Sequence, residues 1–449
     1  MNELNYDVAV IGTGSAGSTV AYKVNSAGKK VVVIDEFEIG GTCQLRGCNP
    51  KKVLTGAAGA VKTAENLYGK GIDGDMKINW GELVKFERSF LEGAPEANES
   101  AYENKGIKVI KAHAEFEDKN IIKAGNNRIK AENIVIASGS KPMRLNIMGE
   151  EYMKTGDDFM KMEKMPDKIV FAGGGYIAFE LAHIASAAGA DVTILEAGSE
   201  VLRGFDSGIV GAVKKASEEA GIKININSAV HKIAPDKDSG YIVHAGDNGS
   251  KKYSCGLVIK AVGRVPNTDG LKFDRAGISS ENGKIKVNEF MQAEENENVY
   301  FGGDVDNKGA YLTPVAGMEG TVIANNILKK EKEKSDYTGV PSAVFTYPPA
   351  AGAGLTEKEA QDKKINYTVK KGDMSKWMSY RRMNQKYGFY KVVFEKETGK
   401  IIGAHLMGLN AEEVINVFAM AIRLGLTRKE LKKMVWAFPT NTYDINYMV

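Results

Sequence analysis

Two of the three cysteines in this 449-residue sequence lie in one polar segment, residues 40–52. Cys43 and Cys48 are about one helical turn apart, so a disulfide between them is geometrically possible if the segment is helical. The alternative, two cysteines buried as small apolar residues, fits poorly beside Gln44, Arg46 and two lysines. With so few cysteines, any disulfide is expected to be catalytic and not part of a structural framework.

A glycine-rich turn ahead of the cysteine segment predicts a nucleotide cleft. An apolar strand pattern leads into Gly12, a helix opens near Gly17, and a second strand ends at Asp35. Gly12 permits the tight turn, Gly14 lets the backbone approach a pyrophosphate, and Gly17 allows close packing of helix on strand. The helix N-terminus favours phosphate, and Asp35 is placed to accept hydrogen bonds from a ribose.

The same pattern recurs later in the chain. A strand leads into Gly173, a helix follows with Ala178 at the third glycine position, and the next strand ends at Glu196. The fingerprint allows alanine at that position. Two dinucleotides in two separate clefts are therefore predicted. The alternative is a pair of strand–helix–strand units that hold no nucleotide.

Composition excludes several classes of protein. Hydrophobic residues make up 43% and charged residues 26%, which is typical of globular domains, and a net charge of +3 gives no nucleic-acid or membrane footprint. The five histidines show no metal-ligand spacing, so no metal site is expected. The third cysteine, Cys255, follows a strand pattern and is expected to be packing. No apolar stretch approaches 18 residues, and an intracellular, cytoplasmic protein is expected.

Three further motifs accompany the cysteine segment and the glycine turns. They are residues 137–142 (Ala-Ser-Gly-Ser-Lys-Pro), residues 263–267 (Gly-Arg-Val-Pro-Asn), and residues 302–305 (Gly-Gly-Asp-Val) followed by 312–316 (Leu-Thr-Pro-Val-Ala). In these motifs, their order and their spacing, the sequence resembles the class I pyridine nucleotide-disulfide oxidoreductases nearly end to end. That family of flavoproteins includes glutathione reductase, dihydrolipoamide dehydrogenase and mercuric reductase.

The resemblance implies an α/β fold with two Rossmann-like dinucleotide-binding domains and a C-terminal α+β dimerisation domain. The FAD-binding domain would cover residues 1–145 and 267–338, the NAD(P)-binding domain residues 146–266, and the dimerisation domain residues 339–449. A homodimer is expected by the same analogy, with neither nucleic acid nor membrane as a partner. The charged run at residues 329–334 is expected to be a solvated linker.

The resemblance also implies FAD in the first cleft and NADH or NADPH in the second. On the FAD side it indicates Gly12, Gly14, Ser15, Ala16, Gly17, Asp35, Glu36, Gly41, Thr42, Gly47, Lys52, His113, Ala114, Ser138, Gly139, Asp304, Leu312, Thr313 and Pro314. On the nicotinamide side it indicates Gly173, Gly174, Gly175, Tyr176, Ile177, Glu180, Glu196 and Gly263. Asp304 would hold the ribityl chain, and residues 312–314 would pass near the flavin ring.

By the same resemblance, electrons pass from NAD(P)H through FAD to a redox-active Cys43–Cys48 disulfide and then to the acceptor. Cys48 would be the thiolate next to the flavin, and Cys43 the outer thiol that exchanges with the substrate. Lys51 and Glu180 match the pair found beneath the flavin. A deprotonated sulfur is the form that attacks a disulfide.

The C-terminal tail departs from the family pattern. Phe438 stands where disulfide reductases have a histidine, and Tyr443 stands at the position of its partner glutamate. General acid–base groups contribute about 10²–10⁴-fold, and phenylalanine cannot transfer a proton. Tyr22 and Lys23 occupy the place of the substrate-binding arginine of glutathione reductases, and the tail lacks the cysteines of mercuric reductases. Candidate replacements for the acid are Tyr443, Asp444 and Tyr447.

Three functions remain open. We favour an NAD(P)H-dependent flavoprotein that reduces a small-molecule or protein disulfide. The alternatives are reduction of a quinone, a metal ion or oxygen, and a degenerate scaffold subunit. NADH is the expected coenzyme, because Glu196 can accept hydrogen bonds from both ribose hydroxyls and would repel a 2′-phosphate. Arg203 weakens that expectation, since an arginine slightly further on helps bind the phosphate in NADPH-dependent relatives.

Overall fold

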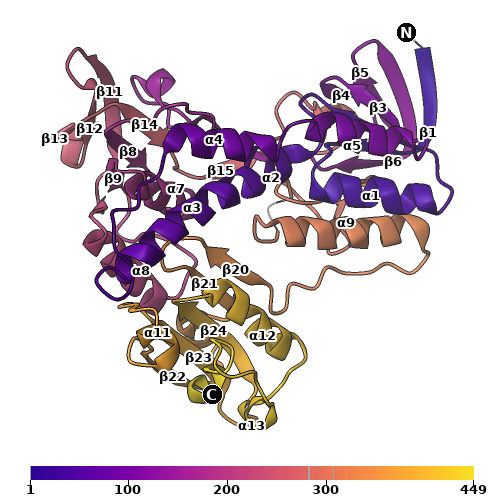
Figure 1. Ribbon diagram of the computed structural model, residues 1–449. Helices are drawn as coiled ribbons and strands as arrows, with labels where there is room; N and C mark the ends of the chain where they lie inside the picture. The colour runs from indigo at the N-terminus through magenta and orange to yellow at the C-terminus, as the bar shows by residue number, and fades with distance from the viewer. Residues whose placement is uncertain (1, 282–283, 307) are drawn as a thin grey trace. The chain divides into compact units, whose positions relative to one another are not determined.

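The computed structural model describes residues 2–281, 284–306 and 308–449 (Figure 1). The chain divides into two compact units. The first unit comprises residues 1–51, 87–143 and 264–337, and the second comprises residues 52–86, 144–263 and 338–449. The finer division into three domains stays a prediction.

The first unit is built on an eight-stranded sheet with a mainly parallel core. It comprises β1 (Asn2–Ile11), β2 (Val31–Asp35), β3 (Lys108–Lys111), β4 (Ala114–Asp118), β5 (Ile121–Ala124), β6 (Asn127–Ile136), β18 (Gln292–Ala293) and β19 (Asn296–Phe301). The main order is β18-β19-β6-β1-β2-β3, and β5 joins β4 to β6. Val8, Ala9 and Val10 of β1 are fully buried. A continuous apolar strand is typical of a parallel sheet covered on both faces.

Helices and short strands complete the first unit. They are α1 (Ser15–Ser26), α2 (Gly41–Arg46), α5 (Ala94–Glu103), α9 (Thr313–Leu328), the 3-10 helix η3 (Phe273–Ala276), β7 (Ser140–Pro142), β15 (Arg264–Pro266), β16 (Ser280–Glu281) and β17 (Lys284–Ile285). α1 lies along α9 (Figure 1). A Cβ on Gly320 of α9 would come within 2.6 Å of the Ala16 carbonyl oxygen, so glycine is what permits this close approach.

The charged run at residues 329–334 is exposed at every residue except the half-buried Glu333, as expected for a solvated linker, and hydrogen bonds also fasten it to α9. The Glu333 backbone N–H donates to Asn326 Oδ1 over 2.6 Å, and Lys332 Nζ donates to the Asn326 carbonyl over 2.7 Å. The Lys332 ammonium also lies 5.6 Å from the centre of the Tyr300 ring. The run therefore folds back on the end of α9, because Asn326 is buried and supplies both a donor and an acceptor.

The second unit contains a four-stranded parallel sheet and a three-stranded antiparallel sheet. The parallel sheet has the order β10 (Lys223–Asn225), β9 (Asp191–Leu195), β8 (Lys168–Ala172), β14 (Leu257–Lys260), and the antiparallel sheet consists of β11 (Val230–Asp236), β12 (Gly240–Ala245) and β13 (Lys251–Cys255). The helices of this part include η1 (Glu150–Tyr152), α6 (Gly156–Met160), α7 (Tyr176–Ala187), α8 (Ser207–Glu219) and η2 (Asp247–Gly249). The predicted second strand–helix–strand pattern is confirmed. Cys255 is buried in an apolar cluster, as expected.

Two helices contain a point at which the chain passes between the units. They are α3 (Cys48–Asn66) and α4 (Trp80–Ser89). In α3 the change falls between Lys51 and Lys52, so the cysteine end belongs to the first unit.

A five-stranded antiparallel sheet forms the C-terminal part. Its order is β20 (Pro341–Val344), β21 (Ala350–Gly354), β24 (Ile401–Met407), β23 (Phe389–Glu395), β22 (Tyr367–Asp373), and its helices are α10 (Glu357–Asp362), α11 (Met378–Arg381), α12 (Ala411–Arg423), α13 (Arg428–Lys433) and α14 (Ile445–Met448). The predicted strands near residues 390–394 and 401–406, and the helix from Ala411, are confirmed.

A buried lysine links this C-terminal sheet to the start of α8 in the same unit. Lys391 of β23 has a side chain only 4% exposed, and its Nζ lies 2.8 Å from Asp206 and 2.9 Å from Glu357. Asp206 also caps α8 by accepting from the Gly208 N–H. Both acids therefore compensate the charge of a lysine that burial would otherwise disfavour.

Across the described residues, no helix is long and apolar enough to cross a membrane. No group of three or more metal-ligating side chains is found in the same part of the chain.

Candidate functional site

The cysteine pair lies where two helices meet. Cys43 belongs to α2 and Cys48 begins α3, with Gly47 between them at φ −139° and ψ −101°. The two sulfurs are bonded, and the Cα atoms are 4.7 Å apart. A Cβ on Gly47 would lie only 3.0 Å from the Thr42 carbonyl oxygen. The ring is therefore closed across a break between two helices, and not within one helical turn.

The surroundings of Cys48 favour a negatively charged sulfur once the disulfide is opened. Cys48 is the first residue of a 19-residue helix, and the positive end of a helix dipole favours the thiolate form of a cysteine there. Its Sγ lies 3.5 Å from the hydroxyl of Thr313, the first residue of α9. Two residues that the sequence placed at the flavin are thus in contact.

The first glycine turn is fastened to the cysteine segment through Asp35. Asp35 Oδ2 accepts hydrogen bonds from the Thr13 backbone N–H at 2.8 Å and from the Thr13 hydroxyl at 2.7 Å, and Oδ1 accepts from the Phe37 N–H. The Thr13 hydroxyl in turn accepts from the Gly40 N–H at 3.0 Å. Gly41 touches the turn directly, since a Cβ there would lie 2.5 Å from the Gly14 Cα. The glycine turn and the disulfide segment are therefore linked by hydrogen bonds and by direct contact.

This turn fits the pyrophosphate of a dinucleotide such as FAD. Gly12 has φ +102°, and a Cβ there would overlap the Ala137 carbonyl. Gly14 caps α1 with no side-chain hydrogen bond, and the space where its Cβ would stand is open. An uncapped helix N-terminus leaves N–H groups for an anion. Ser15, Ala16 and Gly17 follow in the first turn of α1.

A cavity of about 340 Å³ adjoins this turn and reaches Cys43. It is lined by Thr13, Gly14, Ser15, Ser18, Tyr22, Gly40, Cys43, Gln44, Asn49, Asn98, Tyr102 and Thr313. Asn98 donates to Gln44 Oε1 at 3.1 Å and to the Ile39 carbonyl at 2.9 Å. Tyr22 and Tyr102 stack with their ring centres 4.9 Å apart. Lysine and arginine do not occur among these lining residues, so the wall beside Cys43 is neutral and polar.

Three sequence motifs meet around Asp304. Its Oδ2 accepts from the Ser140 hydroxyl at 2.7 Å, and Arg264 donates to that same hydroxyl at 2.8 Å and to the Ser140 carbonyl at 2.6 Å. β7 and β15 pair here, which places Ser140 opposite Pro266. Nearby, the Ser138 hydroxyl donates to the Asn267 carbonyl, and Gly139 adopts φ +68°. The charge of Asp304 is thus held without being neutralised by a direct ion pair.

Two further carboxyl groups accompany Asp304. Burial raises the pKa of Asp306 to about 6, and burial together with the charge of Asp306 raises the pKa of Glu319 to about 7. Glu319 accepts from the Gly303 N–H at 2.7 Å and from the Tyr337 hydroxyl at 2.8 Å. Burial also raises the pKa of Asp304, opposed by Ser140 and Arg264. Asp306 Oδ2 is buried and has no partner among the described residues, which leaves an acceptor for a bound hydroxyl.

Other residues predicted to contact FAD are placed as follows. Glu36 Oε2 lies 2.9 Å from His113 Nδ1, and Ala114 begins β4. Leu312 precedes α9, and Thr313 and Pro314 open it. Thr42 lies in α2. Lys52 belongs to the second unit, where its ammonium lies 3.7 Å from the centre of the Phe345 ring.

The second glycine turn repeats the first. Gly173 also has φ +102°, and a Cβ there would overlap the Ala261 carbonyl. Gly175 caps α7 without a side chain, and Tyr176 and Ile177 follow. Glu196 accepts from the Gly174 and Gly198 N–H groups, both at 2.7 Å, and lies 3.5 Å from Arg203. Gly263, with φ +116°, lies between β14 and β15.

Lys51 and Glu180, the pair implied by resemblance, belong to different units. Lys51 lies in the first turn of α3, with its N–H donating to the Gly47 carbonyl. Glu180 lies in α7, is 1% exposed, and accepts from the Phe345 N–H at 2.9 Å.

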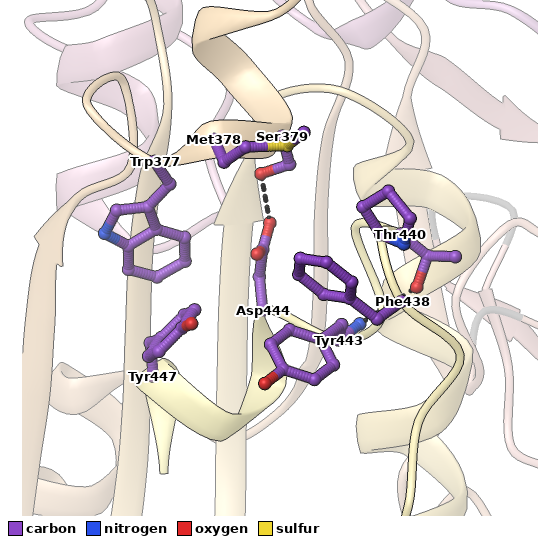
Figure 2. Close-up of a pocket in the computed structure, with 9 residues that line it drawn as sticks. Trp377, Met378, Ser379, Phe438, Thr440, Tyr443, Asp444 and Tyr447 are labelled. Atoms are coloured by element: carbon purple, nitrogen blue, oxygen red, sulfur yellow. Dashed lines mark hydrogen bonds between the residues drawn. The ribbon is translucent and has the colours of Figure 1, made fainter.

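The tail residues surround a small pocket in the second unit (Figure 2). Phe438 is 67% exposed, and its ring meets the Tyr443 ring edge-on at 4.8 Å. Asp444, adjacent in sequence, points the other way, into the pocket, and accepts from the Ser379 hydroxyl. Of the candidate acids, Tyr447 is 50% exposed and Tyr443 is half-buried, whereas Asp444 is only 5% exposed.

Sequence reasoning missed several residues that hold the site together: Thr13, Ser140, Arg264 and Glu319. Thr13 was the residue between the first two glycines, and Arg264 and Ser140 stood inside motifs already singled out. The contacts of Ser140 with Asp304 and Arg264 join segments more than 100 residues apart, and Thr13 acts through Asp35 and Gly40, so no local pattern reveals these roles. Glu319 left one signal in the sequence, since it is a glutamate within an otherwise uncharged helix and glutamate is rarely buried.

Comparison with known proteins agrees with this geometry. Residues 6–320 match the family model for pyridine nucleotide-disulphide oxidoreductases, and residues 340–448 match its dimerisation domain. The chain is 29% identical to a glutathione reductase of Nostoc sp., with 98% of each chain covered, and 30% identical to a mercuric reductase of Lysinibacillus sphaericus, with 98% of this chain and 81% of the relative covered. It is 29% identical to a dihydrolipoyl dehydrogenase of Haloferax volcanii, covering 97% and 93%. The chain therefore belongs to the pyridine nucleotide-disulphide oxidoreductases, a family of flavoprotein oxidoreductases whose members bind FAD and NAD(P)H.

Proposed function

We propose that this enzyme uses NAD(P)H and FAD to reduce an external disulfide through Cys43 and Cys48. The observation that carries the proposal is the bonded cysteine pair at the start of α3, fastened through Thr13 and Gly40 to the phosphate turn. A redox pair and a cofactor cradle that share one hydrogen-bond network are suited to exchange electrons. A buried pair used only for packing would not need this attachment.

The chain's own residues divide the work. Gly12, Gly14 and Ser15 would hold the FAD pyrophosphate, and Asp304 with Ser140 would hold the ribityl hydroxyls. Bound FAD supplies the two-electron chemistry between NAD(P)H and the disulfide. Opening the disulfide takes up two electrons and leaves two sulfurs, of which Cys48 is kept as thiolate at the helix N-terminus.

The outer sulfur then exchanges with the acceptor. Cys43 lines the 340 Å³ cavity and would attack one sulfur of the substrate disulfide, releasing the other as a thiolate and forming a mixed disulfide. Cys48 would resolve that mixed disulfide, which releases the second substrate thiol and restores the Cys43–Cys48 bond. Two electrons thus reduce one substrate disulfide to two thiols.

The cavity and the tail support an acceptor other than glutathione disulfide or lipoamide. The neutral wall of Tyr22, Gln44 and Asn98 gives a carboxylate-rich disulfide no cation to bind. Phe438 cannot protonate a leaving thiolate. A disulfide whose thiol has a low pKa needs no such proton. The slow step is therefore expected after reduction of the enzyme.

The lack of a proton donor at Phe438 also supports a second candidate, transfer of electrons to a quinone, a metal ion or oxygen. These acceptors need no thiolate to depart. The third possibility, a scaffold subunit without activity, predicts a colourless protein.

NADH is the proposed coenzyme. Glu196 lies after β9 with both carboxylate oxygens in use by backbone N–H groups, and each oxygen retains a lone pair for a ribose hydroxyl. The C-terminal residues 339–449 are proposed to form the homodimer interface, which light scattering of the purified protein would test.

Anaerobic reduction followed by an acceptor screen tests the proposal. One equivalent of NADH should make two thiols alkylatable per chain, with Cys43 modified first because it lines the cavity. Stopped-flow mixing with each disulfide then measures reoxidation. Reoxidation by glutathione disulfide as fast as NADH reduction would show that Phe438 is not limiting. Quinone reduction that persists in Cys43→Ser, together with a parent enzyme that turns over no disulfide, would favour the second candidate.

A further inference from the structure

A loop between β19 and α9 carries Asp304 and leads to the residues predicted to pass near the flavin ring. Its described residues are 302–306 and 308–312. From α9, which lies along α1 (Figure 1), Glu319 reaches back to the beginning of this loop. We propose that Glu319 is a positioning residue for bound FAD, and that a proton held by this side chain strengthens the binding of FAD.

Both oxygens of Glu319 are engaged. The residue is 1% exposed, its Oε2 accepts from the Gly303 N–H at 2.7 Å, and its Oε1 accepts from the Tyr337 hydroxyl at 2.8 Å. A Cβ on Gly309 would lie 2.8 Å from Glu319 Oε1 and 2.9 Å from Tyr337 Cε1, so the loop passes directly over this pair. Asp304 follows Gly303 in the chain. The position of its carboxylate, the predicted partner of the ribityl chain, therefore depends on Glu319.

Three carboxyl groups meet at this loop, those of Asp304, Asp306 and Glu319, and the latter two residues are buried. The groups that donate to them are neutral. Asp304 accepts from the Ser140 hydroxyl and Asp306 accepts from the Lys308 backbone N–H. Carboxyl groups gathered away from water cannot all be ionised, because each negative charge disfavours the next. The cluster is therefore expected to hold a proton near neutral pH.

Two cations lie near the cluster, and both donate to other acceptors. Lys308 Nζ donates to the Asn288 carbonyl, and Arg264 donates to the hydroxyl and the carbonyl of Ser140. The charge of Lys308 favours ionised Asp306, and that of Arg264 favours ionised Asp304. The remaining titratable groups around the cluster are Tyr311 and Tyr337, and burial raises the pKa of both, so they are uncharged.

Glu319 is the acid that holds the proton most tightly. Burial and the charge of Asp306 raise the pKa of Glu319 to about 7, against about 6 for Asp306. In the protonated state one oxygen still accepts from Gly303, while the other can donate to the Tyr337 oxygen. Loss of the proton keeps the loop tied but adds a negative charge beside Asp304. FAD brings an anionic pyrophosphate to the same cleft, so it should bind more weakly as the pH rises through this range.

The inference rests on the proposed FAD site but not on the identity of the acceptor. Ultrafiltration of the diluted FAD-containing protein gives the apparent Kd, because FAD in the filtrate is measured by its fluorescence after adjustment to one pH. The apparent Kd should rise about tenfold between about pH 6 and about pH 9. A purified protein without FAD would contradict the proposed function and this inference with it. Bound FAD whose Kd does not change with pH would contradict this inference alone.

Variants separate charge from packing. Glu319→Gln keeps an acceptor for the Gly303 N–H and should lose most of the rise in Kd. Tyr337→Phe removes a donor that favours ionised Glu319, and should move the midpoint of the pH profile to higher pH. Asp306→Asn removes a neighbouring negative charge, and should move that midpoint to lower pH.

Glu331→Gln is the matched control, because Glu331 is an exposed glutamate in the segment that follows α9. This variant should keep the parent profile. If Glu319→Gln does not fold, the opposite shifts in Tyr337→Phe and Asp306→Asn decide the matter. A midpoint that stays in place in both variants would show that Glu319 only packs, and would overturn the proposal.

Discussion

The two glycine turns have the same backbone conformation but make different side-chain contacts. Gly12 and Gly173 have the same φ of +102°, and in each turn a backbone N–H donates to the acid that ends the next strand. In the first turn that acid, Asp35, is also bound by the Thr13 hydroxyl, which reaches the cysteine segment. In the second turn the acid lies beside Arg203.

The third position of the fingerprint differs for a steric reason. A Cβ on Gly17 would overlap the Gly12 carbonyl oxygen, whereas Ala178 fits and is fully buried. Helix α1 therefore lies closer to its strand than α7 does. The shared backbone serves any pyrophosphate, and the side chains around it decide which nucleotide binds and what the cleft is coupled to.

Exchange of the third residue between the two turns should give the largest effect. Gly17→Ala forces α1 away from the turn, and we expect FAD affinity to fall at least 100-fold, giving largely colourless protein. The matched change Ala178→Gly removes one buried methyl and adds glycine to a helix, each costing about 1 kcal/mol, and should leave FAD bound. Flavin absorbance per chain measures both. One FAD per chain in Gly17→Ala would show that the helix can move at no cost.

The carboxyl cluster of the first cleft should make stability depend on pH. Burial raises the pKa of Glu319 to about 7 from 4.5, so between these values the folded state holds a proton that the unfolded state has released. Stability therefore falls as pH rises through this window, by on the order of 3 kcal/mol. Glu319→Gln should make that dependence less steep in urea unfolding of the apoprotein and leave the part that the raised pKa of Asp306 contributes. The surface variant Glu163→Gln should keep it, and an equally steep profile in Glu319→Gln would assign the proton elsewhere.

Removal of the link between turn and disulfide should cost less. Thr13→Val deletes the hydroxyl that donates to Asp35 and leaves the Gly40 N–H without its acceptor, a loss of about 2 kcal/mol in the free energy of unfolding. Thr13→Ser keeps the hydroxyl and should behave like the parent. The prediction fails if serine and valine are equally destabilising.

Reversal of charge in the second turn should give the smallest change in free energy. Glu196→Arg should raise the ratio of kcat/KM for NADPH over NADH at least tenfold, about 1.4 kcal/mol, because it removes the repulsion of a 2′-phosphate. Arg203→Ala leaves the carboxylate in place and should keep the preference for NADH. A parent enzyme that already prefers NADPH tenfold would overturn the assignment of Glu196.

The sequence predicted the elements well and the connections between them poorly. Glycine spacing and apolar runs are local, so both strand–helix–strand units and the C-terminal strands could be placed before the structure. The contact of Ser140 with Arg264 spans 124 positions, and the return of Lys332 and Glu333 to Asn326 depends on a buried amide that charge patterning does not show. Charge patterning correctly predicted that this run is exposed, and it gave no sign of the hydrogen bonds to Asn326.

In the candidate site too, local patterns could be predicted and contacts between distant segments could not. The cysteine spacing indicated a disulfide, but the break at Gly47 that closes it follows from packing of Gly47 against the Thr42 carbonyl. At the tail, Phe438 in the histidine position indicated that the family's proton donor is missing. The aromatic side chains around Asp444 could not be foreseen, since Trp377 lies 67 positions away in the sequence (444 − 377).

The buried Lys391 has a consequence for how the second unit comes apart. Its two acids lie on α8 of the nucleotide-binding part and on α10 beside the C-terminal sheet. Unfolding of the nucleotide-binding part alone would remove Asp206 and leave the buried Lys391 with only the partly exposed Glu357, and breaking a buried pair in this way costs about 3–5 kcal/mol. Hydrogen exchange at the slowest amides of β9 and β23 should therefore occur in one concerted event. The glycine-turn cleft and the surface formed by the C-terminal sheet would then be lost together, in the same unfolding event.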